Sequence, residues 1–133
     1  MPLVLFLTLL LVVPISTVRA DDCESPLDQA TMNECADKGY KKTDAKLNAL
    51  YKQIKERLQG DNDTMQLLIA AQRAWLTYRD AECKFSTSSV SGGSVYPSIY
   101  ADCADRLTKK RVDDFKAYLA CQEGDLSCPI PVE

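Results

Sequence analysis

The chain contains three stretches in which apolar or small residues recur at steps of three and four, the spacing that places them on one face of a helix. In the first stretch these positions are Met32, Ala36, Tyr40, Thr43, Leu47, Leu50, Ile54 and Leu58. Ser25 and Pro26, which precede them, have the residue types of a helix N-cap and first turn. The pattern predicts a helix over about 26–58, with Gly39 as the one point where a kink or a break is expected.

Two further helices are predicted after the turn residues at 59–63. The second helix covers about 64–84, and its apolar face consists of Leu68, Ala71, Trp75, Tyr78 and Ala81. The third covers about 97–120, begins after Tyr96, and has as its apolar face Tyr100, Cys103, Leu107, Phe115, Tyr118 and Leu119. Each helix therefore has one side to bury.

The segments between and after these helices are rich in serine, glycine and proline. Residues 86–96 cannot sustain a helix and predict the longest flexible loop, and residues 122–133 predict an irregular tail. Because the joining segments are short, neighbouring helices should run in opposite directions. We expect an all-α fold: a disulfide-stapled three-helix bundle, mostly antiparallel, with irregular N- and C-terminal arms, formed by a single domain over 21–133.

The first twenty residues have a different character from the rest of the chain. A run of leucine, valine and phenylalanine ends at Pro14, and Val18 and Ala20 fit the positions before a signal-peptidase cut. The apolar run is about a dozen residues long, shorter than the roughly 20 that span a bilayer. Residues 1–20 therefore predict a signal peptide, with the mature chain beginning at Asp21. We expect an exported protein without a stable membrane anchor, periplasmic in a Gram-negative bacterium or secreted.

All six cysteines lie in the predicted mature chain. An even number of cysteines in an exported domain of this size indicates disulfides. Proximity in the assumed bundle favours the pairs Cys23–Cys35, Cys83–Cys103 and Cys121–Cys128. An antiparallel arrangement also brings Cys35 near Cys83, so that a Cys35–Cys83 bond is the rival pairing.

Composition narrows the chemistry that the chain can perform. The formal charge of -3 argues against a nucleic-acid partner, and the absence of histidine removes histidine bases and most transition-metal sites. There is no Cys-x-x-Cys motif, and we expect neither a metal nor another cofactor. The remaining acid pairs, Asp61/Asp63, Asp102/Asp105 and Asp113/Asp114, are explained by solvation on turns and exposed helix faces. We therefore expect a binding protein rather than an enzyme.

Three features have both a structural and a functional interpretation. Trp75 could stack on a ligand, but its place on the apolar face favours the core. Arg111 falls between apolar positions, so its guanidinium needs a partner, and Asp44 and Asp80 are the candidates. The serine–glycine loop is either a connector or the partner-binding site. In the second case, the binding residues would be Ser91, Gly92, Gly93, Ser94 and Tyr96.

The order of these features resembles the LprI-like lysozyme-inhibitor domain family of exported bacterial proteins. The resemblance covers about residues 23–120 and rests on Gln29, Met32, Asn33, Cys35, Ala36, Tyr40, Asp44, Leu47, Asn48, Tyr51, the run Ala71–Asp80, Cys83, the run Gly92–Ser94, Cys103, Thr108 and Arg111. It implies a helical fold with paired cysteines. The positions to which it assigns a structural role are Gln72, Trp75, Arg79, Asp80 and Arg111.

The resemblance also implies a class of partner. Our leading hypothesis is an exported protein that binds and inhibits a cell-wall hydrolase, lysozyme first, by steric occlusion of its cleft. The alternatives are a periplasmic immunity protein that neutralises a delivered toxin effector, and an envelope protein without inhibitory activity. Mildly acidic exported proteins suit the immunity role because basic effectors attract acidic partners. The sequence does not determine the oligomeric state.

Overall fold

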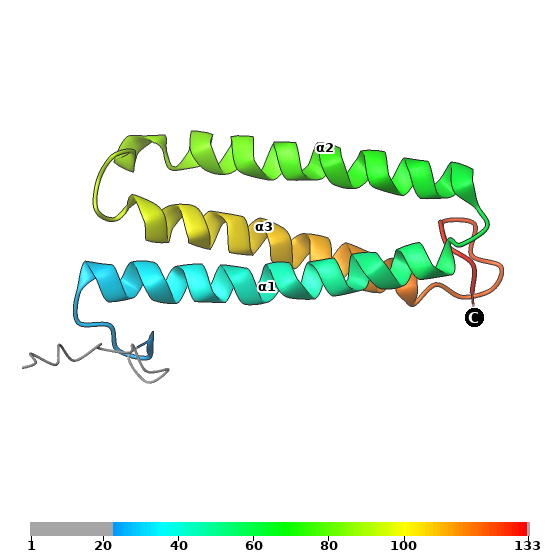
Figure 1. Ribbon diagram of the computed structural model, residues 1–133, viewed down its shortest axis with the longest axis horizontal. Helices are drawn as coiled ribbons and strands as arrows, with labels where there is room; N and C mark the ends of the chain where they lie inside the picture. Colours follow the sequence, from blue (N-terminus) through cyan, green and yellow to red (C-terminus); the bar gives the residue numbers. More distant parts are fainter. Residues whose placement is uncertain (1–22, 133) are drawn as a thin grey trace, which may run out of the picture.

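A computed structural model describes residues 23–132 and confirms the all-α fold (Figure 1). Its elements are α1 (Gln29–Arg57), α2 (Asn62–Ser86), the short 3-10 helix η2 (Ser88–Val90) and α3 (Tyr96–Leu119). Consecutive long helices run in opposite directions, and no strand occurs within residues 23–132. The segment that the sequence indicates as a signal peptide lies outside the described residues. None of the described helices is long and apolar enough to cross a membrane.

Side-chain caps set the starts of the first two helices. Asp28 is the N-cap of α1, and its carboxylate accepts a hydrogen bond from the backbone N–H of Thr31 at 2.8 Å. The expected start at Ser25 and Pro26 was therefore wrong, because the carboxylate at position 28 satisfies an N–H group of the first turn. α1 then runs without a break through Gly39. Gly60, with a φ of +94°, lies in the turn between α1 and α2, and Asp61 is the N-cap of α2.

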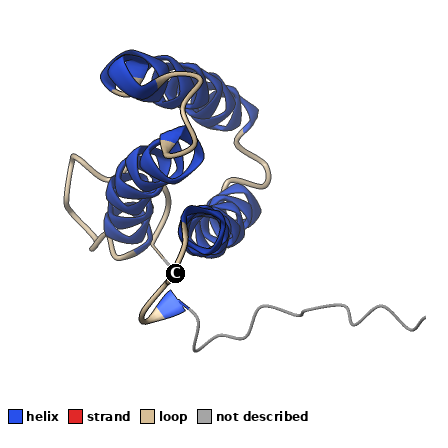
Figure 2. Ribbon diagram, turned by 90° about the vertical axis from the view of Figure 1, so that its left-hand side faces the viewer, coloured by secondary structure: helices blue, strands red, loops and turns tan. Residues whose placement is uncertain are grey.

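The closest helix pair is α1 and α3, which run parallel to each other (Figures 1 and 2). α3 lies between α1 and α2 and contributes more buried residues than any other element, including the small side chains of Ser98, Ala101, Ala104 and Thr108. Small residues let two helix backbones approach closely. The chain thus forms its main contact between its first and last helices, with α2 as the more peripheral element.

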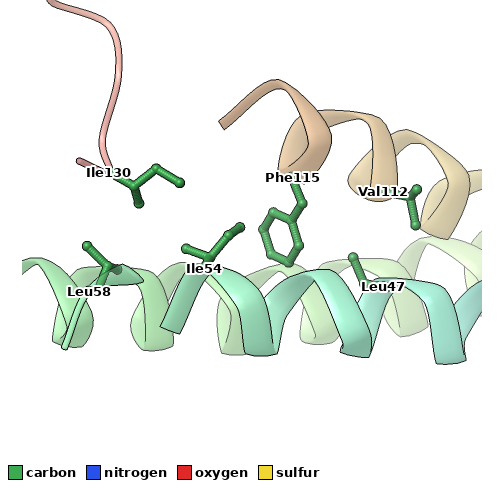
Figure 3. Packing of buried hydrophobic residues seen from close by; sticks show 6 residues of the cluster. All are labelled: Leu47, Ile54, Leu58, Val112, Phe115 and Ile130. Carbon is green, nitrogen blue, oxygen red and sulfur yellow. The ribbon is translucent and has the colours of Figure 1, made fainter. Parts of the chain in front are cut away.

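The principal core is formed by residues of α1, α3 and the C-terminal tail (Figure 3). Its buried members are Leu47, Ile54, Leu58, Val112, Phe115 and Ile130. The ring of Phe115 stacks on that of Tyr51, with centroids 6.1 Å apart. Ile130 belongs to the tail, which the sequence predicts only as irregular. In the structure this tail folds back and covers the end of the core, where Ile130 is 4% exposed.

Three disulfides staple the bundle, and they are the expected pairs: Cys23–Cys35, Cys83–Cys103 and Cys121–Cys128. The rival Cys35–Cys83 bond does not form. Cys83 and Cys103 join the end of α2 to the start of α3 and sit in a second small core with Ala104 and Leu107. This bond crosses 20 positions of sequence, and closing such a loop contributes about 3 kcal/mol in the chain-entropy model.

The rotation of α2 about its axis differs from the expected one. Leu68 and Trp75 pack toward the core as predicted, but Ala71, Tyr78 and Ala81 are exposed. In their place Gln72 and Arg79 face inward. The reason is the Cys83–Cys103 bond: Cys83 must face α3, and residues 79, 75, 72 and 68 lie on the same side of the helix.

The rotation leaves an apolar strip on the outer face of α2, in steps of four and three. It consists of Leu67, Ala71, Ala74, Tyr78, Ala81 and Phe85. The three large members are well exposed: Leu67 by 70%, Tyr78 by 54% and Phe85 by 76%. The strip explains why the sequence pattern pointed to the wrong face.

We predict that Ile130→Ala lowers the free energy of unfolding by about 2 to 4 kcal/mol, because it opens a cavity at the covered end of the core. The matched control is Leu126→Ala in the same tail, where the side chain is fully exposed; it should change stability by less than about 0.5 kcal/mol. Urea unfolding followed by circular dichroism measures both. Equal effects of the two substitutions would show that the tail does not close the core.

Candidate functional site

The serine–glycine loop is an ordered structure held against the bundle. Its first residues form η2, and successive turns follow, in which Gly93 N–H bonds to the Val90 carbonyl and Tyr96 N–H to the Gly93 carbonyl, both at 3.1 Å. The side-chain amide of Asn33 on α1 donates to the Ser94 carbonyl at 3.0 Å. Where the sequence predicts a flexible loop, the structure shows regular turns, and these turns and the Asn33 bond satisfy backbone groups that would otherwise bond to water.

The loop tip presents small polar residues to solvent. Ser91, Gly92, Gly93 and Ser94 are all exposed, and Gly92 adopts a φ of +79°, which favours glycine. The structure thus places four of the five expected binding residues together at one tip. Tyr96, the fifth, is half-buried at the start of α3.

A tyrosine-lined cleft lies beside this tip. It has a volume of about 390 Å³, and three tyrosines contribute to its wall: Tyr40 from α1 and Tyr96 and Tyr100 from α3. The rings of Tyr96 and Tyr100 are 5.8 Å apart and tilted by 40°. Tyrosine offers a large apolar face and a hydroxyl at little entropic cost, which is why it is common in protein interfaces. We call the loop tip and this cleft together the loop-end surface.

A cluster centred on Arg79 packs against Tyr40, one of the tyrosines of the cleft. Arg79 is 8% exposed, and its guanidinium is flanked by the rings of Tyr40 at 5.5 Å and Trp75 at 5.4 Å. Its Nε donates to Asp80 at 2.9 Å, and Nη1 lies 3.5 Å from the carboxylate of Asp44. Two carboxylates and two aromatic faces thus compensate one buried charge and join α2 to α1.

The same cluster changes the acid–base behaviour of its members. Burial raises the pKa of Tyr40, and the carboxylates of Asp44 and Asp80 add to the rise while Arg79 opposes it. Burial also raises the pKa of Tyr100, with Asp80 adding to it. Burial alone would lower the pKa of Arg79, but the hydrogen bond to Asp80 and the nearby charges raise it overall. Arg79 is therefore a permanent cation at this position.

Arg111 forms a second stack further along the same interface. Its guanidinium lies 4.6 Å from the ring centroid of Phe115 and 6.0 Å from that of Trp75. Nε donates to the side-chain oxygen of Gln72 at 3.2 Å, and Nη1 is 3.6 Å from the carboxylate of Asp114. Trp75 is thus a core residue between two arginines, as the structural interpretation of its position expected.

The expected partners of Arg111 were wrong. Asp44 and Asp80 pair with Arg79 instead, and Gln72 takes their place at Arg111. Both differences follow from the rotation of α2, which turns Arg79 toward α1 and Gln72 toward α3.

Sequence reasoning missed Asn33, Tyr40 and Tyr100 as members of the loop-end surface. A signal was present: Asn33 and Tyr40 are two helical turns apart, and Tyr96 and Tyr100 one turn apart, so each pair shares a face. Only the parallel packing of α1 on α3 brings the two pairs together. No group of acidic or cysteine side chains in residues 23–132 has the arrangement of a metal site.

Tyr40 and Tyr100 should ionise late in an alkaline titration. Because their pKa values are raised on folding, the folded state retains these protons, and the free energy of unfolding should fall as pH rises above about 10. Followed by tyrosinate absorbance, the Tyr40→Phe variant should lose absorbance at the alkaline end of the native titration. A loss confined to the start of that titration would contradict the burial of this hydroxyl.

Comparisons with known proteins agree with the resemblance seen in the sequence. A family model described as "Lysozyme inhibitor LprI" matches residues 20–115. A protein of Rhizobium meliloti (strain 1021), named "Uncharacterized protein R02472", is 33% identical over 114 residues, which cover 77% of this chain and 82% of that protein. No solved structure matches. Since the family model spans more than half of the chain, the protein is a member of the lysozyme inhibitor LprI family.

Proposed function

We propose that this protein is an exported inhibitor that binds a cell-wall hydrolase, with lysozyme as the first candidate, and acts by occupying its substrate cleft. The observation that carries the proposal is the loop-end surface: an ordered, exposed tip of small polar residues beside a cleft of three tyrosines. Membership in a family named for lysozyme inhibition supports the choice of target. In this proposal the chain works by binding and catalyses no reaction.

The mechanism is steric. The tip formed by residues 91–94 is narrow because two of its residues are glycines and the other two are serines, so it can enter a groove that a larger side chain could not. Asn33, the turns and the Cys83–Cys103 bond hold the tip in one conformation before binding. Preorganisation reduces the entropy that binding would otherwise cost, which favours a tight complex.

In this proposal the tyrosine cleft provides most of the binding affinity. Backbone and hydroxyl groups of the tip would bond inside the enzyme's cleft, and the tyrosine rings would pack against its rim. Interfaces of this kind owe most of their affinity to a few aromatic residues. The buried Arg79 cluster behind Tyr40 keeps that ring fixed.

Export is part of the proposal. The leader pattern of residues 1–20 and three disulfides both suit an oxidising compartment outside the cytoplasm, periplasmic or extracellular. A cell-wall hydrolase acts in that same compartment.

The test is inhibition of cell lysis by purified lysozymes, combined with binding measured by calorimetry. We expect the wild type to slow lysis and to form a stoichiometric complex. Ser94→Arg should weaken inhibition by about tenfold or more, because a long charged side chain at the tip cannot enter the groove. The matched control is Gln59→Arg, which places the same side chain on an exposed position of the turn between α1 and α2, a turn that lies at the opposite end of the bundle from the serine–glycine loop.

The outcomes test separately whether the protein is an inhibitor and whether the loop-end surface is its interface. If Ser94→Arg and Gln59→Arg inhibit equally well, the protein is an inhibitor but the loop-end surface is not the interface. If the wild type neither binds lysozymes nor slows lysis, the proposed function is wrong. Affinity capture of one dedicated toxin would then support the immunity role.

A further inference from the structure

A second cavity lies at the other end of the bundle, where the C-terminal tail folds over the helices. It has a volume of about 240 Å³, is bordered by α1, α2, α3 and the tail, and is partly open to solvent. Figure 3 shows three of its wall residues, Ile54, Leu58 and Ile130. The tail that closes the cavity lies beyond residues 20–115, the range matched by the family model. The loop-end surface has no part in it.

Seven of the ten wall residues are aliphatic, and the other three are Thr64, Tyr118 and Arg111. Ile54 and Leu58 are each 1% exposed, and Leu68 and Ala71 of α2 line the facing side. Leu67, which also lines the cavity, is 70% exposed, so the cavity is open to solvent along α2. Side chains around an unfilled apolar space lose contacts that a fitting apolar molecule would restore.

One charged group interrupts this apolar wall. Arg111 lines the cavity, and its side chain is only 12% exposed. Its Nε is used by Gln72, while the carboxylate of Asp114 is 3.6 Å from Nη1, longer than a hydrogen bond, and is itself 55% exposed. Within residues 23–132, Nη2 has no hydrogen-bond acceptor. A guanidinium held between the rings of Phe115 and Trp75, with donors unused, is suited to a carboxylate.

We propose that this cavity binds a medium-chain fatty acid, with its carboxylate on Arg111 and its aliphatic chain against Ile54, Leu58 and Ile130. Charge and polarity together select this class, because a single cation at the edge of an apolar space matches a molecule with one anionic head and an apolar body. The volume agrees with the chain length. An apolar cavity of about 150 Å³ holds benzene, so 240 Å³ corresponds to about nine or ten carbon atoms.

The chain carries its own reporter for this site. Trp75 is the only tryptophan, and its ring lies 6.0 Å from the guanidinium of Arg111. Three probes separate the contributions of head and chain: octanoate, 1-octanol with the same chain and no charge, and acetate with the charge and no chain. Titrations are followed by tryptophan fluorescence and by calorimetry on the disulfide-bonded protein.

We expect octanoate to bind saturably at one site, 1-octanol to bind at least about tenfold more weakly, and acetate not to bind. Arg111→Gln should lower octanoate affinity by about tenfold or more and leave 1-octanol affinity unchanged. The matched control is Arg106→Gln, an exposed arginine of the same helix that does not line the cavity, which should bind octanoate like the wild type.

A second variant keeps the test decisive if Arg111→Gln does not fold. Ala71→Leu changes an exposed position of α2 to another good helix former and places a larger side chain in the cavity opening, so it should weaken the binding of octanoate and of 1-octanol alike. The proposal is overturned if octanoate shows no saturable binding to the wild type. It is equally overturned if octanoate and 1-octanol bind the wild type equally well, or if folded Arg111→Gln retains octanoate affinity.

Discussion

The parallel contact between α1 and α3 is the constraint on which the rest of the molecule depends. Phe115 of α3 is fully buried at its centre and stacks on Tyr51 of α1. Because these two helices are joined by all of α2, the chain must cross the length of the bundle twice before the contact closes. Both proposed sites are consequences of this arrangement: the tyrosine cleft forms where the two helices begin, and the aliphatic cavity where they end.

α2 is held in a different way from the other two helices. Its inward face contains Gln72, Trp75 and Arg79, and the stack runs from the Tyr40 ring through Arg79, Trp75 and Arg111 to Phe115. Such contacts are directional, since each guanidinium must lie over a ring and reach its acceptor, whereas aliphatic packing tolerates sliding. The stack therefore defines the position of α2 as well as its attachment.

Helical spacing was sufficient to predict the three helices. Proximity in an antiparallel bundle favoured the three disulfides that the structure shows but left Cys35–Cys83 as a rival. The rotation of α2 was not predictable from apolar spacing, since Ala71, Tyr78 and Ala81 form an apolar face as regular as the buried one. The position of Cys83 carried the missing information, because a disulfide to α3 turns that side of α2 inward. The rotation of α2 also explains why Arg111 bonds to Gln72 and not to Asp44 or Asp80. For the candidate site, composition identified the loop tip, but Tyr40 joins it only through a contact between distant segments.

The order of the helices along the chain has a consequence for how the molecule forms. α1 has its main partner in α3, which is complete only at Leu119, so neither α1 alone nor α1 with α2 can bury the apolar face that contains Leu47 and Ile54. Contacts of such long sequence separation form late and slowly. During synthesis the growing chain therefore has no finished core until α3 has been added, and its apolar residues on α1 stay accessible to solvent or to other proteins until then.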